Sequence, residues 1–420
     1  MEKLRIAVWH NLPSGGGKRQ LYYHVQGLVE RGHYLEAWCP NSADQNYLSL
    51  SGIIKEHVLP LEVCKGSDHF PRSVNTVRAL ARAIEENAQR CAEQINRGGF
   101  DVLHANPCIY FRTTPIARYV HLPSVLTLHE PFRELYEALP ELPWIAPPMA
   151  AQRPFLSRTS WQCLGDTVTE RLALEGLRLQ ARKELEYAHT FDVLLSNSRF
   201  SRESILRAYN IESKICYLGI DTDLFRPTGE AKEYFVLGLG TISLAKGVDR
   251  AIRAIAAVRK EKRPPIVWIS NASNENHLIS FRALAQRLDV EFIHRDNIPD
   301  NDVVSLLSRA MAMIYTPRLE PFGLAPLEAN ACGTPVVAIA EGGVRESVQD
   351  GINGFLAPDD DPEMLGGLIS RFLDDPSLSY SMGLQGMEYV QYHWNMKSCI
   401  DNIESHLLRV STIPKKVSAL

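Results

Sequence analysis

The sequence lacks long hydrophobic runs, cysteine pairs and an excess of charge of either sign. No stretch of its 420 residues approaches the roughly 18 consecutive apolar residues that a membrane-spanning helix needs. The apolar run near the N-terminus stops at His10 and Asn11, so it is too short for a secretory signal peptide. We therefore expect a cytoplasmic protein with no transmembrane segment, for which peripheral contact with a membrane stays open.

The cysteines are scattered along the chain, and no two of them form a Cys-x-x-Cys pair. This distribution is typical of reduced, mostly buried thiols in a cytosolic protein. It indicates neither a disulfide framework nor a zinc site. The eight positions are Cys39, Cys64, Cys91, Cys108, Cys163, Cys216, Cys332 and Cys399.

Charge and composition exclude further classes of protein. The 45 Lys and Arg residues nearly balance the 49 Asp and Glu residues, so the net charge is only −4. Without an overall basic field, nucleic acid is not the expected partner. With 45% hydrophobic and 22% charged residues, the chain is neither disordered nor fibrous. Its length exceeds what one hydrophobic core usually fills, which predicts two domains.

Short apolar runs alternate with stretches of helical length, such as 18–31 and 198–209. This alternation predicts an α/β protein with doubly wound parallel sheets. The pattern restarts after a break at 218–233, whose glycine, proline and aspartate residues suit a linker. Strands are expected at 4–10, 34–39, 101–105, 124–129 and 192–196, and then at 234–240, 265–270, 290–294, 312–316 and 335–339.

One segment, 131–165, does not follow this alternation. It is rich in proline and shows no clear periodicity. A connection of this length is either a surface excursion that packs its own aromatic residues or a lid over an acceptor site.

A glycine-rich loop, Ser14-Gly15-Gly16-Gly17-Lys18, follows the first expected strand. Glycines there let backbone N–H groups approach an anion at the positive end of the next helix. The loop matches neither the Gly-x-Gly-x-x-Gly fingerprint nor a Walker loop. By itself it is equally well explained as a tight turn.

The run from Arg318 to Pro335 carries the strongest pattern. A strand is expected to end near Thr316, and the prolines at 321 and 326 favour a helix that begins around 322–324. Glu320 then stands at the strand end, and Glu328 lies more than one helical turn later. Such a helix N-terminus can hold a diphosphate while the two carboxylates bind hydroxyl groups on either side. The apolar, glycine- and proline-containing surroundings argue against a solvated helix face.

This run resembles the Glu-(seven residues)-Glu signature of retaining GT-B glycosyltransferases, family 4 in particular. The segments 218–227, Lys246-Gly247, Gly342-Gly343 and 350–356 also resemble that family. The resemblance implies two facing Rossmann-like domains with the donor nucleotide in the cleft between them. The domains would be 1–220 and 221–392, and 393–420 would form a helix that returns to the first domain.

The resemblance also implies roles on the donor side. Glu328 would accept hydrogen bonds from the ribose hydroxyls, and Glu320 would contact the transferred sugar. The backbone N–H groups of Phe322, Gly323 and Leu324 would face the sugar and the diphosphate.

Further roles concern charge and the acceptor. Lys246 would neutralise the leaving diphosphate, and His129 would lie near the sugar and the acceptor. Gly16 and Gly17 would border the donor phosphate and the acceptor. His104, which precedes an Asn-Pro turn, is expected to be structural.

One position departs from the family. Thr241 stands where the family commonly has an arginine, five residues before Lys246. A hydroxyl does not replace a guanidinium charge on a diphosphate. Either Arg318, Arg345 or Lys18 compensates, which we favour, or the site lacks one charge and turnover is slow. Arg318 is counted among the donor-binding residues beside Thr241 itself.

The implied reaction moves a sugar from a nucleoside-diphosphate sugar to an acceptor hydroxyl with retention of the anomeric configuration. The expected donor is a UDP sugar, with GDP and dTDP sugars as alternatives, and the acceptor is a glycan, a lipid-linked molecule or a natural product. No metal or other cofactor is implied, and residues 359–361 are expected to cap a helix. The alternatives are another GT-B activity, such as nucleotide-sugar epimerisation, and a two-domain binding protein without activity.

Overall fold

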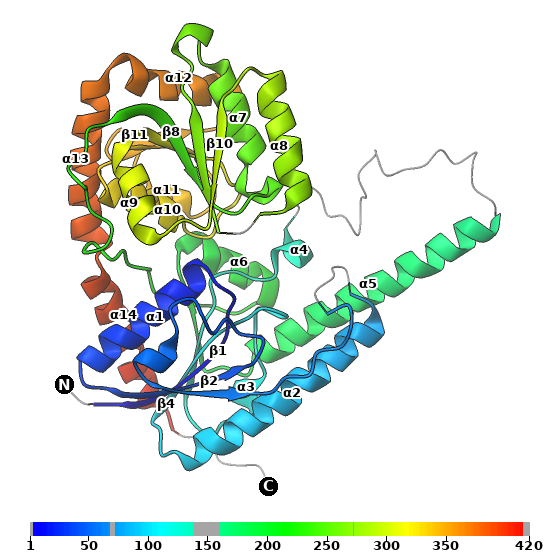
Figure 1. Cartoon of the computed structure of the whole chain (residues 1–420). Helices are drawn as coiled ribbons and strands as arrows, with labels where there is room; N and C mark the ends of the chain where they lie inside the picture. The colour runs from blue at the N-terminus through cyan, green and yellow to red at the C-terminus, as the bar shows by residue number, and fades with distance from the viewer. Residues whose placement is uncertain (1–2, 68–71, 138–159, 272, 415–420) are drawn as a thin grey trace. The chain divides into compact units, whose positions relative to one another are not determined.

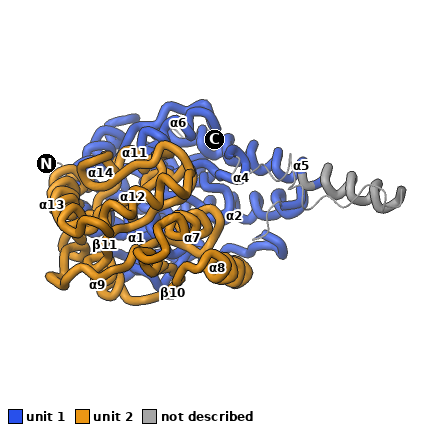
Figure 2. Tube along the Cα trace, turned by 90° about the horizontal axis from the view of Figure 1, so that it is seen from above, with its two compact units in different colours: residues 1–216, 400–420 blue, residues 217–399 orange. Residues whose placement is uncertain are grey.

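A computed structural model describes residues 3–67, 72–137, 160–271 and 273–414. The chain divides into two compact units, which Figure 2 colours separately. Unit 1 consists of residues 1–216 and 400–420, and unit 2 consists of residues 217–399. The boundaries expected from the sequence were 220 and 392.

Unit 1 is built on a seven-stranded sheet in which all neighbouring strands are parallel (Figure 1). Its strand order is β3-β2-β1-β4-β5-β6-β7, so the chain reverses its direction of progress across the sheet between β1 and β4. The strands are β1 (Arg5–Asn11), β2 (Tyr34–Pro40), β3 (Lys55–Leu59), β4 (Val102–Cys108), β5 (Ser124–Thr127), β6 (Val193–Ser196) and β7 (Lys214–Ile215).

The helices of unit 1 bury the sheet. One core joins apolar side chains of α2, α5 and α6 with those of the central strands. Helices α1 and α14 pack closely, because a Cβ atom at Gly27 would come within 2.6 Å of the Ile400 side chain. The helices are α1 (Gly16–Glu30), α2 (Val74–Arg97), α3 (Ile116–Tyr119), α4 (Arg133–Tyr136), α5 (Ser160–Ala188), α6 (Arg199–Tyr209) and α14 (Met396–Ser411), with a short 3-10 turn, η1 (Leu50–Gly52).

Unit 2 repeats this architecture with six parallel strands in the order β10-β9-β8-β11-β12-β13. Successive residues along a strand serve opposite faces: Val236 belongs to one hydrophobic core and Leu237 to the other. The strands are β8 (Glu233–Leu239), β9 (Ile266–Ser270), β10 (Phe292–Asp296), β11 (Ala310–Tyr315), β12 (Val336–Ile339) and β13 (Gly354–Ala357).

Helices cover both faces of this second sheet. Side chains of α7, α8 and α12 line one core, and those of α9 and α10 line the other. The helical elements are η4 (Leu244–Lys246), α7 (Val248–Ala257), η5 (Lys260–Lys262), α8 (Glu275–Arg287), α9 (Asp300–Arg309), α10 (Leu324–Ala331), α11 (Val344–Ser347), α12 (Pro362–Asp374) and α13 (Pro376–His393).

Most elements expected from the sequence are confirmed. The ten predicted strands correspond to β1, β2, β4, β5, β6 and β8–β12, and Ser198 caps α6 as expected. Strands β3, β7 and β13 were not predicted. The expectation that 160–165 is irregular was wrong, because α5 begins at Ser160. Most of the predicted insert, 138–159, lies outside the described residues. Among the described helices, none is both long and apolar enough to cross a membrane.

Both sheets have a point where consecutive connections leave in opposite directions. It lies between β1 and β4 in unit 1 and between β8 and β11 in unit 2. In open parallel sheets, ligands bind outside the carboxyl ends of the strands at such a switch point. The loops after β8 and β11 are therefore the first place to look for a site in unit 2.

Candidate functional site

Lys246 and Glu320 meet at the switch point of unit 2. Lys246 follows β8 and Glu320 follows β11, two strands that are neighbours in the sheet. The ammonium nitrogen lies 2.9 Å from each carboxylate oxygen of Glu320. The Lys246 side chain is 28% exposed and that of Glu320 is 15% exposed. The pair is thus a partly buried ion pair that solvent can still reach.

The turn that carries Lys246 is locked onto the end of β11. The Ser243 side chain caps the turn by accepting a hydrogen bond from the Lys246 backbone N–H. Gly247 has φ 71° and lies so close to β11 that a Cβ atom there would come 2.1 Å from the Thr316 carbonyl oxygen. The Thr316 hydroxyl donates to the Gly247 carbonyl at 2.8 Å. Only glycine fits this position, which explains the Lys-Gly pair in the sequence.

The loop that carries Glu320 rests on the Gly342-Gly343 turn. The Gly343 N–H donates to the Glu320 carbonyl oxygen at 2.8 Å. A Cβ atom on Gly342 would come 2.4 Å from the same oxygen. Leu319 has φ 49°, a left-handed conformation that costs a non-glycine residue about 1–2 kcal/mol. Such strain at a strand end is common at functional sites.

Helix α10 begins beside this loop, as the sequence predicts. Gly323 is its N-cap residue with φ 95°, and no side chain caps the helix there. The Phe322 side chain is buried and packs against the rings of Tyr217 and Trp394. Phe322 can therefore offer a ligand only its backbone. The uncapped first turn of α10 gives this place the positive potential of a helix N-terminus.

Glu328 lies on α10 and is buried, with 7% of its surface exposed. This excludes the solvated helix face that the sequence left as an alternative to a site. Its charge acts on Cys332, one turn later, and adds to the burial that raises the pKa of that thiol to about 12. Burying a carboxylate is costly and has to be offset by polar neighbours, so its position reflects a specific requirement.

Thr241 and Arg318 lie near this ion pair in the chain but have other partners. The Thr241 hydroxyl is 3.4 Å from the Ser243 hydroxyl. Arg318 donates to Glu341 at 2.6 Å and to Asp360 at 3.4 Å, and the bond to Glu341 is the main reason why the pKa of Arg318 is raised. The guanidinium predicted to compensate for Thr241 thus already has two carboxylate partners.

Arg345 and Lys18, the other two candidates to compensate for Thr241, differ in their exposure to solvent. Arg345 is exposed and donates to the Gly342 carbonyl at 3.2 Å, so it lies on the turn that supports Glu320. Lys18 belongs to unit 1 and its side chain is fully buried. The expectation that Lys18 serves the diphosphate is wrong on this ground, because a sealed ammonium group cannot meet a ligand in solution.

The acidic run at 359–361 acts structurally, as expected. Asp361 caps α12 by accepting a hydrogen bond from the Glu363 N–H. Asp360 accepts from Arg250 at 2.6 Å and from Arg318 at 3.4 Å. Arg250 and Glu341 were not predicted from the sequence. No spacing rule marks them, because their partners are distant in the chain.

In unit 1, His129 follows β5 and lies next to the glycine-rich loop. A Cβ atom at Gly17 would come 3.7 Å from His129 Nε2 and 3.6 Å from its Cδ2 atom. Asn197 Nδ2 lies 3.5 Å from His129 Nδ1, which favours the tautomer that carries its proton on Nε2. Burial lowers the pKa of His129 to about 4. Its imidazole is therefore neutral at pH 7 and can exchange hydrogen bonds with a hydroxyl group.

The glycine-rich loop of unit 1 forms the start of α1. Gly15 is the N-cap residue with φ 131°, and Gly16 is exposed at the first helical position. The structure thus brings Gly17 and His129 together and leaves Gly16 at the surface of the same turn. His104 is buried, and its Nε2 atom lies 2.9 Å from the Thr127 hydroxyl, in agreement with the structural role expected for it.

The fold is shared with solved glycosyltransferase structures. A structure of Anabaena HepE in complex with UDP and glucose is 17% identical, with a TM-score of 0.68 over 97% of this chain and 100% of that chain. Sucrose-phosphate synthase from Thermosynechococcus elongatus is also 17% identical, with a TM-score of 0.70 over 97% of this chain and 99% of that chain. The chain therefore has the GT-B fold, with two Rossmann-like units.

Curated relatives share part of the sequence. D-inositol 3-phosphate glycosyltransferase of Acidothermus cellulolyticus is 30% identical over 50% of this chain and 52% of its own length. The human alpha-1,3/1,6-mannosyltransferase ALG2 is 24% identical over 52% of this chain and 59% of its own length. The chain thus spans about half the length of the curated relatives it matches.

Two family descriptions together span nearly the whole chain. Residues 220–388, which contain the Lys246–Glu320 pair and α10, match the family described as Glycosyl transferases group 1. Residues 14–224, which contain the glycine-rich loop and His129, match Glycosyltransferase Family 4. The chain belongs to the family 4 glycosyltransferases.

Proposed function

We propose that this protein transfers a sugar from a nucleoside-diphosphate sugar to an acceptor hydroxyl and retains the anomeric configuration. The observation that carries the proposal is the Lys246–Glu320 pair at the switch point of unit 2, beside the uncapped N-terminus of α10. A cation, a carboxylate and free helix N–H groups are the groups that a diphosphate linked to a sugar requires.

The donor is assigned to unit 2. The diphosphate takes the place of the Glu320 carboxylate at Lys246, and the released carboxylate accepts hydrogen bonds from hydroxyls of the transferred sugar. The N–H groups of Phe322, Gly323 and Leu324 face the phosphate oxygens and the sugar. Glu328, already buried on the same helix, accepts from the ribose hydroxyls.

Catalysis then depends on the charge that develops on the leaving diphosphate. Lys246 and the positive end of α10 stabilise that charge in the transition state, which is usually the largest single catalytic contribution in such sites. The phosphate oxygen that leaves the sugar accepts the proton of the incoming acceptor hydroxyl. This scheme keeps the anomeric configuration and requires no metal ion.

The acceptor is assigned to unit 1. His129, neutral at pH 7, donates its Nε2 proton to a hydroxyl of the sugar or acceptor, and Gly17 leaves the space in front of that nitrogen open. Gly16 borders the same space at the start of α1. We propose an acceptor that is a glycan, a lipid-linked molecule or a natural product, and a cytoplasmic enzyme that can touch a membrane surface without spanning it.

For the donor we favour a UDP sugar, because UDP and glucose occupy the HepE structure that shares this fold. A GDP sugar is the main alternative, since a relative from Mycolicibacterium smegmatis, 28% identical over 49% of this chain, is described as GDP-mannose-dependent. A dTDP sugar is the third choice.

Two measurements test the proposal. A thermal-shift screen of UDP, GDP and dTDP sugars identifies the donor, because a ligand that binds the folded state raises the apparent melting temperature. Release of the nucleoside diphosphate is then followed with and without candidate acceptors, and NMR of the product gives the anomeric configuration. We expect one nucleotide class to stabilise the protein and to be turned over with retention.

Other outcomes separate the alternatives. Stabilisation without any release of nucleoside diphosphate identifies a binding protein. A new nucleotide sugar that still carries its diphosphate identifies an epimerase. A product of inverted configuration contradicts the retaining mechanism.

A further inference from the structure

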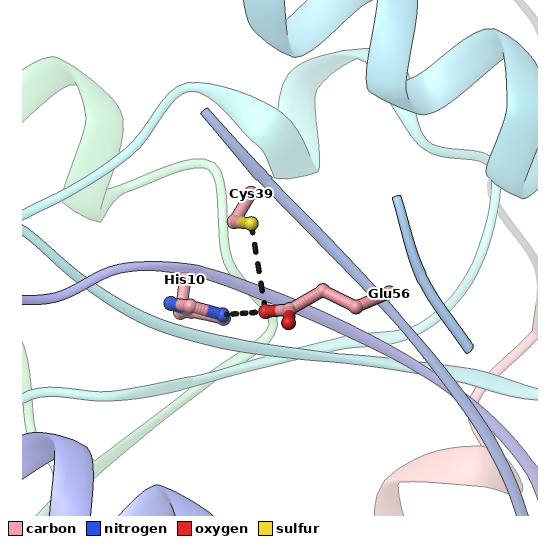
Figure 3. A group of neighbouring side chains, drawn as sticks. All are labelled: His10, Cys39 and Glu56. Atoms are coloured by element: carbon pink, nitrogen blue, oxygen red, sulfur yellow. Dashed lines mark hydrogen bonds and ion pairs between the residues drawn. The ribbon is translucent and has the colours of Figure 1, made fainter. Parts of the chain in front are cut away.

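A second group of functional side chains lies within unit 1, on three neighbouring strands. His10 comes from β1, Cys39 from β2 and Glu56 from β3, and Figure 3 shows their side chains pointing toward one another. A Glu56 carboxylate oxygen lies 3.0 Å from His10 Nε2 and 3.6 Å from Cys39 Sγ. The donor atoms of all three residues lie within 4.8 Å of one another.

This cluster is sealed and incompletely satisfied. His10 and Cys39 have no exposed surface, and the Glu56 side chain is 2% exposed. Lys18, at the start of α1, is fully buried nearby, and its charge acts on His10, Cys39 and Glu56 alike. Among the described residues, Lys18 Nζ finds no hydrogen-bond partner. A buried ammonium group without a partner is costly, which points to a further polar group beside the cluster.

We propose that His10, Cys39 and Glu56 bind a divalent transition-metal ion of the zinc class, with His10 Nε2, Cys39 Sγ and one Glu56 oxygen as ligands. Thiolate, imidazole and carboxylate are the ligand types of Zn²⁺ in proteins, and three protein ligands leave one position for a solvent molecule. The thiolate argues against Mg²⁺ and Ca²⁺, which prefer oxygen ligands alone.

One of the two ligand–ligand distances already suits this ion. With bonds of about 2.3 Å to sulfur and about 2.1 Å to oxygen, a tetrahedral zinc ion holds the two atoms about 3.6 Å apart. This equals the distance between Cys39 Sγ and Glu56 Oε1. The 3.0 Å between His10 Nε2 and Glu56 Oε1 is shorter than the about 3.4 Å of a tetrahedral site, so the imidazole has to move away from the carboxylate when the ion binds. On binding, the Cys39 thiol releases its proton to solvent as the sulfur–metal bond forms, and the imidazole proton of His10 moves from Nε2 to Nδ1 so that Nε2 can bind the ion. No electron is transferred. The oxygen of a solvent molecule in the fourth position supplies the acceptor that Lys18 Nζ lacks.

The proposed ion would tie together one edge of the sheet. β3 is the edge strand of the seven-stranded sheet, and the ion would link it to β2 and β1. The role is structural and independent of sugar transfer. The spacing also explains why the sequence indicated no zinc site: the ligands are 29 and 17 residues apart along the chain, which matches no short metal-binding motif.

The test uses the purified full chain. Its metal content is measured by mass spectrometry, and protein stripped with a chelator is titrated with Co²⁺, which reports its ligands through its absorption spectrum. We expect one equivalent of Co²⁺, a thiolate-to-cobalt charge-transfer band and the intense visible bands of a tetrahedral site. Cys39→Ser should abolish the charge-transfer band and weaken binding by about tenfold or more. The control is Cys399→Ser, whose thiol is also buried but lies outside the cluster.

The outcomes are distinct. If the unaltered protein binds no Co²⁺, or binds it without a charge-transfer band, the proposal is wrong and Lys18 serves only as an internal counter-ion to Glu56. The proposal is also wrong if Cys399→Ser loses the band and Cys39→Ser keeps it. Because the unaltered protein alone decides whether a thiolate site exists, a Cys39→Ser protein that fails to fold does not block the test. His10→Gln then provides the second ligand variant, with the same expected loss of affinity.

Discussion

The loops at the switch point of unit 2 keep a lysine and a glutamate within reach of solvent, whereas the corresponding sheet of unit 1 buries its lysine completely. Lys246 is 28% exposed and paired with Glu320, while Lys18 is sealed and lacks a hydrogen-bond partner among the described residues. Both lysines follow the first strand of a parallel sheet. The same architecture therefore makes a lysine accessible to a ligand in unit 2 and buries a lysine in unit 1.

The histidines extend this contrast. Burial lowers the pKa of His24 to about 3 and the pKa values of His104 and His129 to about 4, so all three imidazoles are neutral at pH 7. His24 and His104 lie in the interior, and His129 is the partly exposed one of the three. A neutral imidazole such as that of His129 suits a hydroxyl group, and an accessible charge such as that of Lys246 suits a diphosphate. The division of labour proposed above, with the acceptor on unit 1 and the donor on unit 2, follows from this difference.

The largest effect is expected at Lys246, where the contrast between the units is sharpest. Lys246→Ala should lower turnover by about 10²–10³-fold and the affinity for donor much less, because the charge on the diphosphate grows in the transition state. Steady-state kinetics and calorimetry measure the two quantities. The control is Lys260→Ala, because Lys260 is an exposed lysine of the same unit and is paired with Asp289. An equal loss in turnover and affinity would show that Lys246 binds the donor in the ground state and does not stabilise the transition state further.

Glu328 tests whether the buried carboxylate of unit 2 belongs to the donor site. Glu328→Gln replaces a charged acceptor with a neutral one, and a hydrogen bond to a charged group is worth about 1.5–3 kcal/mol. We therefore expect about a tenfold or greater loss in affinity for the nucleoside diphosphate, measured by calorimetry. Glu363→Gln, at an exposed position on α12, should bind normally. Unchanged affinity in Glu328→Gln would rule out the proposed hydrogen bonds between Glu328 and the ribose.

Acid should weaken unit 1 through its buried histidines. Their folded pKa values lie below the ordinary value of 6.5, so between pH 6.5 and about 4 the unfolded chain binds protons that the folded unit excludes. Each such histidine removes stability as pH falls through this window, by about 1 kcal/mol per pH unit. We expect His104→Asn to make the free energy of unfolding fall less steeply between pH 6.5 and 4.5 than in the unaltered protein.

Glu184 has the opposite effect on stability as pH falls, and comparing the two proteins removes its contribution. Burial raises the pKa of Glu184 to about 8, so its protonation in the folded state adds stability as pH falls toward its ordinary range. That contribution is the same in both proteins and cancels in the difference. Parallel slopes, measured by chemical denaturation, would show that His104 does not resist protonation in the fold.

The smallest effect is expected at Thr241. Because Arg318 is already paired with Glu341 and Asp360, we expect Thr241→Arg to add a usable charge and to tighten nucleoside-diphosphate binding by about fivefold, or about 1 kcal/mol. The measurement is a double-mutant cycle with Arg318→Ala and another with Arg345→Ala. Weaker binding in Thr241→Arg, with coupling to either arginine, would show that an existing guanidinium already fills this place.

The pattern of the fold was predictable from the sequence because apolar runs and helix signals are local. Helix α10 and the strand before Glu320 were placed correctly because the prolines and the strand end all lie within a few residues. Strand β3 was missed, since Lys55–Leu59 begins with three polar residues and is only partly buried at the sheet edge. The start of α5 at Ser160 was also missed, because the apolar residues of that helix do not keep to one face.

The candidate site was predictable only where resemblance supplied the roles. The ion pair between Lys246 and Glu320 joins residues 74 positions apart, so no local sequence pattern predicts it. The partners of Arg318, at Glu341 and Asp360, were hidden for the same reason. Lys18 was misjudged because a sequence shows that a lysine follows a glycine-rich loop, but not whether folding buries its ammonium group.

Hydrogen exchange on the full chain, with and without the UDP sugar selected in the screen, tests the central claim most directly. The account predicts that the donor slows amide exchange in 241–247 and 318–328 of unit 2, where Lys246, Glu320 and the first turn of α10 lie. It also predicts that a double variant with Lys246→Ala and Glu328→Gln loses this protection. Protection that appears only in unit 1, with both segments of unit 2 unchanged at saturating donor, would contradict the assignment of the donor to unit 2.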